Sequence, residues 1–264
     1  MTGSARRFLA RLARESTSTF HWPNGARGAI SLSFDDGRAS AARDGAAILD
    51  AHGQRGTFFV LMEPVRADAQ LWRTVADAGH EIGNHTLSHP CSGNFPWSRR
   101  HALEEYTLAR MALELDAASD EIEAFFGRQP TSFAYCCGQK FVGRSSETRS
   151  YVPLVAERFA VGRGFRDEFP NDPAFVDLAQ VAGVEADGID SSRFIELAEQ
   201  AARCGEWLAI VGHDVGVPGP QTVGARELEA FCRWLGARDD LWVAPVGEVG
   251  AYIARSRVEG SASP

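Results

Sequence analysis

The sequence has too few basic residues for a protein whose main partner is a polyanion. Its 27 lysines and arginines are outnumbered by 35 acidic residues, which gives a net charge of −8 at pH 7. Nucleic acids and anionic membranes attract proteins through basic patches. We therefore expect neither of them as a partner, and the charge predicts little else.

The first residues also contain no uninterrupted apolar stretch. Met1 to Arg14 carries four arginines, and Arg11 breaks the apolar run that begins at Phe8. This pattern predicts neither a signal peptide nor a membrane span. Residues 1–20 are expected to form a basic, poorly ordered arm, and the expected location is the cytoplasm.

The cysteines show no CxxC spacing, and their number is odd. The five are Cys91, Cys136, Cys137, Cys204 and Cys232. This usage favours free thiols in a reducing compartment over a disulfide framework.

The chain shows no internal repeat and no mid-chain linker, so a single domain over residues 21–254 is the simplest prediction, followed by a flexible tail at 255–264. Short apolar runs alternate with helical patterns, and such an order favours a parallel sheet with right-handed crossovers. Strands are expected at 29–35, 57–60, 80–84, 132–135, 159–162, 178–184 and 207–211. The longest helix is expected from about Arg99 to Phe126, with 139–150 as a loop.

Polar side chains gather where these strands end. Asp35 and Asp36 follow the first strand, His85 and His89 follow the third, and His213 follows a late one. In a parallel barrel the carboxyl ends of the strands share one face, where active sites are built. This convergence favours an enzyme.

Two adjacent carboxylates at the end of a buried strand need a cationic neighbour, because burying unpaired charge is costly. His85 and His89 lie four residues apart and provide two imidazoles. One carboxylate with two imidazoles is a three-ligand metal set with open positions, which is typical of catalytic sites. Zinc suits this set, and cobalt or nickel also fits it.

Three motifs in this order resemble the signatures of the polysaccharide deacetylases, the NodB-homology or carbohydrate esterase family 4 enzymes. They are Phe34-Asp35-Asp36-Gly37, the stretch His85-Thr86-Leu87-Ser88-His89, and the strand that ends at His213. The resemblance covers roughly residues 28 to 253. It implies a distorted (β/α)7-type barrel with parallel strands and metal-dependent removal of an acyl group, typically acetyl from an N-acetylated sugar.

The resemblance also implies roles for individual residues. Asp35 matches the general base, and His213 matches the general acid. Asp36, His85 and His89 match the metal ligands. Tyr135 matches the position whose backbone N–H stabilises the oxyanion.

The sequence departs from the family pattern in two places. The family arginine that orients the catalytic aspartate is absent from Ser132-Phe133-Ala134-Tyr135, and Arg163 is the candidate to replace it. The partner acid of His213 is open between Glu185, Asp187 and Asp190.

The expected substrate is an acetylated carbohydrate or a small-molecule amide. An O-acetyl esterase, a small-molecule amidohydrolase and a non-catalytic carbohydrate-binding barrel remain as alternatives. Phe95, Trp97 and Trp22 are open between sugar stacking and packing, whereas Cys136 and Cys137 are expected to be small loop residues. Oligomeric state is not predicted.

Overall fold

The computed structural model describes residues 20–261, and its centre is a sheet of parallel strands that curls into a nearly closed barrel. Around the barrel the strands follow the order β7-β4-β3-β2-β1-β9-β8, and β12 pairs with the first part of β1. The predicted (β/α)7-type barrel is therefore confirmed. The strands are β1 (Gly28–Phe34), β2 (Thr57–Val60), β3 (Glu81–Asn84), β4 (Ser132–Ala134), β7 (Val161–Arg163), β8 (Gly183–Glu185), β9 (Trp207–Gly212) and β12 (Leu241–Val243).

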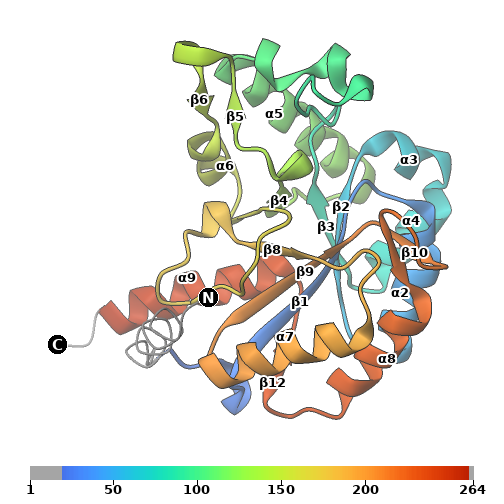
Figure 1. Cartoon of the computed structure of the whole chain (residues 1–264). Helices are drawn as coiled ribbons and strands as arrows, with labels where there is room; N and C mark the ends of the chain where they lie inside the picture. The colour runs from blue at the N-terminus through green and yellow to red at the C-terminus, as the bar shows by residue number, and fades with distance from the viewer. Residues whose placement is uncertain (1–19, 262–264) are drawn as a thin grey trace, which may run out of the picture.

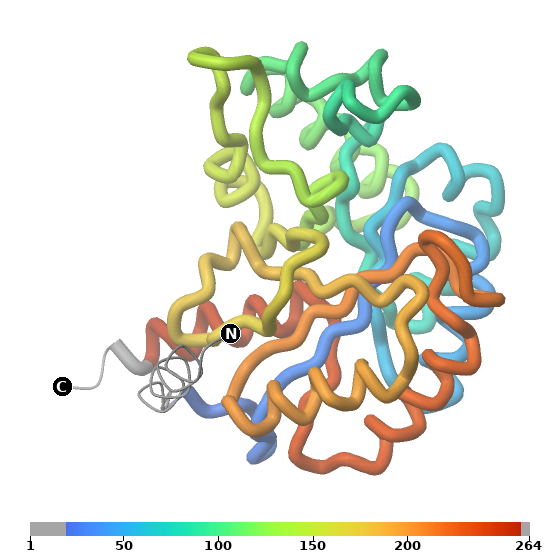
Figure 2. The backbone as a smooth tube through the Cα atoms, viewed as in Figure 1, coloured from blue at the N-terminus to red at the C-terminus, as the bar shows by residue number. Residues whose placement is uncertain are grey.

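Strand β1 lies between parts of the chain that are distant in sequence. It pairs with β9 over six residues on one side, and with β2 and β12 on the other. In Figure 2 the early chain (blue) accordingly runs beside the late chain (orange). All seven residues of β1 are buried, which explains why its sequence is a nearly continuous apolar run.

The two faces of β1 contact different cores. Ile30, Leu32 and Phe34 pack with residues of the surrounding helices, while Ala29 packs inside the barrel with residues of β2, β4 and β9. Successive side chains of a strand alternate between faces. Asp35 therefore continues the interior row of Ala29, Ser31 and Ser33.

The barrel closes between β7 and β8 through a short contact at Val181. Arg163 forms an isolated parallel bridge with Val181, and the Gly164 N–H donates to the Val181 carbonyl at 2.7 Å. Gly183 lies at this seam, where a Cβ atom would lie 2.2 Å from the Gly164 oxygen. The absence of a side chain at Gly183 allows the two strands to approach.

Helices cover the outside of the barrel. In Figure 1, α2, α4, α7 and α8 surround its lower and right sides, and α5 and α6 lie above. Residues of α9 pack with the interior cluster, so α9 helps to fill one end of the barrel. The helices are α2 (Ala46–Ala51), α3 (Met62–Ala67), α4 (Ala69–Asp77), α5 (Leu108–Phe126), α6 (Val152–Arg158), α7 (Ser191–Cys204), α8 (Ala225–Gly236) and α9 (Val246–Ser261).

The long helix α5 begins later than expected. The Thr107 side chain accepts a hydrogen bond from the Arg110 N–H, which is a helix N-cap, and residues 96–101 and 103–105 form separate 3-10 turns. Met111, Leu115 and Ile122 of α5 are buried, so this face of the helix packs against the core. Residues 139–150, expected as a loop, contain the short antiparallel pair β5 (Phe141–Val142) and β6 (Arg149–Ser150).

The tail differs from its prediction. Residues expected to be flexible from 255 onward continue α9 as far as Ser261, because the Arg257 guanidinium donates to the carbonyls of Pro173 and Val176. Residues 262–264 and nearly all of the predicted basic arm (1–19) lie outside the described residues. Between residues 20 and 261, no helix has the length and apolar character needed to cross a membrane.

Candidate active site

The strand ends bring the predicted residues to one end of the barrel, as the sequence pattern predicts. Asp35 and Asp36 follow β1, His85 follows β3, Arg163 ends β7, and His213 follows β9. The backbone of this region adopts unusual conformations: Asp36, Thr86, His89 and Cys137 all have positive φ. Left-handed backbone at non-glycine residues concentrates at functional sites.

Asp36, His85 and His89 converge. One carboxylate oxygen of Asp36, Oδ1, lies 3.4 Å from Nε2 of His85 and 3.4 Å from Nε2 of His89. Ligands about 2.1 Å from a tetrahedral zinc ion lie about 3.4 Å apart. The His85 Nδ1–H can also donate to the Ala134 carbonyl at 2.9 Å, which leaves Nε2 as the ligand atom. The donor types of these three side chains suit a divalent metal ion, and Asp36 lies at ligand spacing from each histidine.

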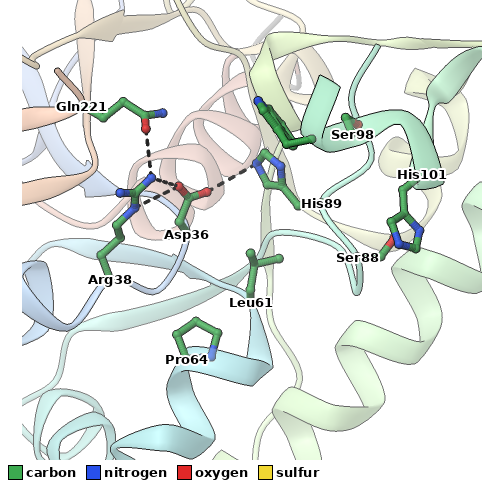
Figure 3. Close-up of a pocket in the computed structure, with 10 residues that line it drawn as sticks. Asp36, Arg38, Leu61, Pro64, Ser88, His89, Ser98, His101 and Gln221 are labelled. Atoms are coloured by element: carbon green, nitrogen blue, oxygen red, sulfur yellow. Dashed lines mark hydrogen bonds and ion pairs between the residues drawn. The ribbon is translucent and has the colours of Figure 1, made fainter. Parts of the chain in front are cut away.

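Arg38 binds the other side of the Asp36 carboxylate. Its Nε and Nη2 donate to Asp36 Oδ2 at 3.1 and 2.8 Å, and Nη2 also donates to Gln221 Oε1 (Figure 3). Its Nη1 donates to Asp214 Oδ2 at 2.8 Å. Burial alone raises the pKa of Asp36, but the hydrogen bond to His85, the charges of both histidines and Arg38 outweigh it and hold the pKa well below its ordinary value. The carboxylate is therefore ionised and ready to bind a cation.

Asp35 forms a buried ion pair with Arg163. The Arg163 Nη2 donates to Asp35 Oδ1, and the two side chains are almost completely buried. The Arg163 Nη1 donates to the Gly164 carbonyl at 2.7 Å, and its guanidinium lies over the Phe59 ring. Asp35 and Arg163 thus meet across the barrel interior from β1 and β7. Arg163, the candidate to replace the arginine absent from β4, therefore contacts Asp35 from β7.

His213 is held by Asp187. The His213 Nδ1 lies 2.5 Å from Asp187 Oδ2, and the His213 backbone N–H donates to Asp187 Oδ1 at 3.1 Å. Burial lowers the pKa of His213, but Asp187, together with the charges of Asp35 and Asp36, raises it above its ordinary value. Of the three candidate acids, Glu185 instead pairs with Arg166.

Tyr135 does not face the site in the predicted way. Its backbone N–H donates to the Arg163 carbonyl at 2.9 Å, as part of the β4–β7 pairing, and its hydroxyl donates to the Ala179 carbonyl. The residue is fully buried. The predicted oxyanion donor is therefore already bonded elsewhere. The turn at Cys136–Gly138 comes next, and its first two N–H groups have no carbonyl partner within the turn.

A buried glutamate that the sequence interpretation missed organises the loop between the two histidines. Glu114 of α5 accepts hydrogen bonds from the backbone N–H groups of Leu87 and Ser88, and from the hydroxyls of Ser88 and Tyr106. Nothing in the local sequence of a long amphipathic helix distinguishes this acid from a solvated one. Only the contacts of Glu114 in the folded chain distinguish it from a solvent-exposed glutamate.

The cysteines correct another expectation. Cys91 and Cys137 form a disulfide that joins the residues just after His89 to the turn after β4, while Cys136, Cys204 and Cys232 are free. Not all five cysteines are free thiols, so their usage no longer supports a reducing compartment. The error arose because pairing depends on distance in the fold rather than on spacing in sequence.

An open pocket of about 500 Å³ lies beside Asp36 and His89. Arg38, Gln221, Leu61 and Pro64 help to line it (Figure 3). Trp97 also lines it and is 60% exposed, with its ring 5.4 Å from Phe95 and 5.6 Å from His89. Asp35 and His213 are not among the lining residues, and Trp22, by contrast, is buried.

Comparisons with known proteins agree with this fold. Residues 22–151 match the family model described as polysaccharide deacetylase. The chain is 30% identical over 116 residues to the peptidoglycan-N-acetylmuramic acid deacetylase PdaA of Bacillus subtilis, which covers 44% of this chain and 40% of that protein. The chain belongs to the polysaccharide deacetylase family.

Solved structures show the same fold at low sequence identity. A Mycobacterium smegmatis structure assigned to the polysaccharide deacetylases superposes with a TM-score of 0.66 at 17% identity, covering 90% of this chain and 94% of that one. A family 4 acetyl xylan esterase from Clostridium thermocellum, in complex with a cobalt ion, gives a TM-score of 0.56 at 18% identity, covering 85% and 91%. The matches span less than half the length of the first curated relatives.

Proposed function

We propose that this protein is a metal-dependent hydrolase that removes an acetyl group from an N-acetylated sugar or oligosaccharide. The observation that carries the proposal is the position of Asp36 Oδ1, 3.4 Å from Nε2 of each histidine. Membership of the deacetylase family supports the reaction class. Zinc suits these ligands, with cobalt or nickel as alternatives.

Asp36, His85 and His89 would hold the ion, and the chemistry that a divalent ion would supply there is polarisation of the acyl carbonyl and a lower pKa of water. Asp35 accepts the proton of the attacking water, and Arg163 fixes the direction of its carboxylate. The N–H groups that begin the Cys136–Gly138 turn are the candidates to donate to the oxyanion in place of Tyr135.

His213 donates a proton to the departing nitrogen. An amine leaves poorly unless it is protonated, and a hydrogen bond from Nδ1 to Asp187 leaves Nε2 of His213 to carry the mobile proton. An ester needs less help at its leaving group. His213→Ala should therefore slow an amide substrate more than an acetyl ester.

The test is acetate release from N-acetylglucosamine oligomers, measured on the protein as purified, after chelation and after zinc is returned. We expect release to stop on chelation and to recover with the ion, and Asp35→Asn to bind the ion without releasing acetate. A folded, metal-loaded protein that binds the oligomers but releases no acetate would instead support a carbohydrate-binding barrel.

Trp97 supports a sugar rather than a small amide as substrate. Its exposed indole borders the pocket beside His89, and aromatic rings offer a flat apolar face to a sugar ring. Trp97→Ala should raise KM for the oligomers about tenfold while leaving KM for p-nitrophenyl acetate within twofold. Phe141→Ala, which removes an exposed ring outside this pocket, is the control. Equal effects on both substrates would favour a small-molecule amidohydrolase.

A further inference from the structure

The two oxygens of the Asp36 carboxylate have different partners. Oδ1 lies 3.4 Å from Nε2 of His85 and 3.4 Å from Nε2 of His89. Oδ2 instead accepts hydrogen bonds from Nε and Nη2 of Arg38, at 3.1 and 2.8 Å. In Figure 3 the carboxylate accordingly lies between Arg38 and His89. Arg38 and the histidines therefore each contact one oxygen of the same carboxylate.

The two hydrogen bonds from Arg38 use the acceptor capacity of Oδ2. An ionised carboxylate offers about four lone-pair sites, two on each oxygen. Because Oδ2 accepts twice from Arg38, the sites that remain for a cation are those of Oδ1. Carboxylates can bind a metal ion through one oxygen or through both. The hydrogen bonds from Arg38 favour the first mode for Asp36.

Arg38 is itself held by a second carboxylate. Its Nη1 donates to Asp214 Oδ2 at 2.8 Å, and its Nη2 donates to Gln221 Oε1 at 3.1 Å. The other oxygen of Asp214 accepts from the Ser40 hydroxyl at 2.5 Å. A guanidinium is planar and presents its donors in a rigid fork, so binding two carboxylates at once fixes its orientation. Asp214 directly follows His213, and this network therefore joins the loop after β1 to the segment that carries His213.

We infer that Arg38 is a positioning residue that limits Asp36 to one metal-binding oxygen and thereby keeps coordination positions of the ion open. The inference rests on the proposed function, because it assumes an ion at Asp36, His85 and His89. Catalytic metal sites need an open position for water or substrate. A second oxygen from Asp36 would fill such a position, so Arg38 acts on the reaction through Asp36.

The test is the binding of zinc, and then of acetohydroxamate to the zinc-loaded protein, by wild type and Arg38→Met. Acetohydroxamate binds a metal ion through two oxygens, so its affinity reports open positions. We expect Arg38→Met to bind zinc at least as tightly as wild type, because Oδ2 becomes available and a nearby positive charge is removed. The zinc-loaded variant should bind acetohydroxamate about 10–100-fold more weakly, the usual range for loss of a group that orients a metal ligand. Isothermal titration calorimetry measures both affinities.

Arg43→Met is the matched control. Arg43 is an exposed arginine of the following turn, and its Nη2 lies 4.0 Å from Asp68 Oδ2. Both affinities of this variant should match wild type. Arg38→Lys keeps the charge but loses the fork of donors, so its acetohydroxamate affinity should lie between those of Arg38→Met and wild type. This variant also provides the measurement if Arg38→Met does not fold.

The outcomes separate this inference from the proposed function. Unchanged acetohydroxamate affinity in zinc-loaded Arg38→Met, or equal weakening in Arg43→Met, would overturn the inference and leave the function standing. Loss of zinc binding in Arg38→Met would also overturn it, because Arg38 would then hold Asp36 in place rather than limit its coordination. A wild-type protein that binds no zinc would overturn both. One that binds zinc and acetohydroxamate but releases no acetate would overturn the function alone.

Discussion

Arg163 is buried among apolar side chains, where it pairs with the carboxylate of Asp35. Removing one partner of a buried pair leaves an uncompensated charge and is strongly destabilising. Arg163→Ala should therefore lower kcat/KM for acetate release about a hundredfold, because general-base catalysis typically contributes 10²–10⁴. Arg163→Lys keeps the charge but loses the planar group. Its kcat/KM should therefore fall between those of Arg163→Ala and the wild type.

The matched control for Arg163 is Arg166→Ala. Arg166 is an exposed arginine of the same segment that pairs with Glu185, and its loss should leave the rate within twofold of wild type. A folded Arg163→Ala protein with an unchanged rate would refute the proposal that Arg163 orients the Asp35 carboxylate.

Asp187 sets the pH range over which His213 can act as an acid. Because Asp187 raises the pKa of His213, the imidazolium persists to higher pH. Asp187→Asn should move the alkaline limb of the kcat/KM profile down by at least about one pH unit. Asp190→Asn, at the other candidate acid, should leave the limb in place, and equal shifts in both variants would refute the assignment.

The same pKa shift affects stability with a definite sign. A histidine whose pKa rises on folding stabilises the folded state fully below its unfolded pKa of about 6.5. This contribution disappears as the pH rises through the folded-state pKa.

At the residue scale, the sequence predicted side chains at strand ends better than their hydrogen-bond partners. Asp36, His85 and His89 converge because parallel strands end on one face. Asp187 was not separable from Glu185 and Asp190, since all three lie on one short stretch and only the fold decides which reaches His213. The N–H of Tyr135 was misassigned because strand pairing is not visible in a single segment.

Among the elements, α5 positions the loop between His85 and His89 through Glu114. Four donors of residues 87, 88 and 106 converge on this carboxylate, and an amide cannot accept from all of them. Glu114→Gln should weaken zinc binding about 10–100-fold, which is the usual cost of losing a group that orients metal ligands. Isothermal titration calorimetry with zinc measures this change in affinity.

Glu123→Gln tests whether any charge loss on α5 has this effect. Glu123 lies on the exposed face of the same helix and contacts Gln129. Equal zinc affinities for Glu114→Gln and wild type would show that the loop keeps its shape without the carboxylate.

Element boundaries were less predictable than element order. The start of α5 depends on Thr107 capping the Arg110 N–H, and the helical pattern upstream of it was misleading because residues 96–105 form 3-10 turns. The end of α9 depends on Arg257 reaching carbonyls of residues 173 and 176, a contact between segments more than 80 residues apart.

For the molecule as a whole, stability depends on the seam between β7 and β8. A Cβ atom at Gly183 would lie 2.2 Å from the Gly164 oxygen and 2.7 Å from Arg163 Cδ. Gly183→Ala should therefore lower the free energy of unfolding by about 1–3 kcal/mol, as overpacking does. Urea denaturation measures the change.

Gly236→Ala is the control, because a Cβ atom there meets no other atom within 4 Å. It should leave stability unchanged or slightly raised. A Gly183→Ala protein as stable as this control would show that residues 163–164 and 183 can move apart enough to accommodate the added methyl group.

The pairing of β1 with β9 and β12 has a consequence for synthesis on the ribosome. Residues 22–151, the part that matches the family model, contain β1 to β4 but lack both late neighbours of β1. A nascent chain of that length exposes one whole edge of its most apolar strand, and such edges promote aggregation. The first half therefore stays unpaired along that edge until residues up to 212 have emerged.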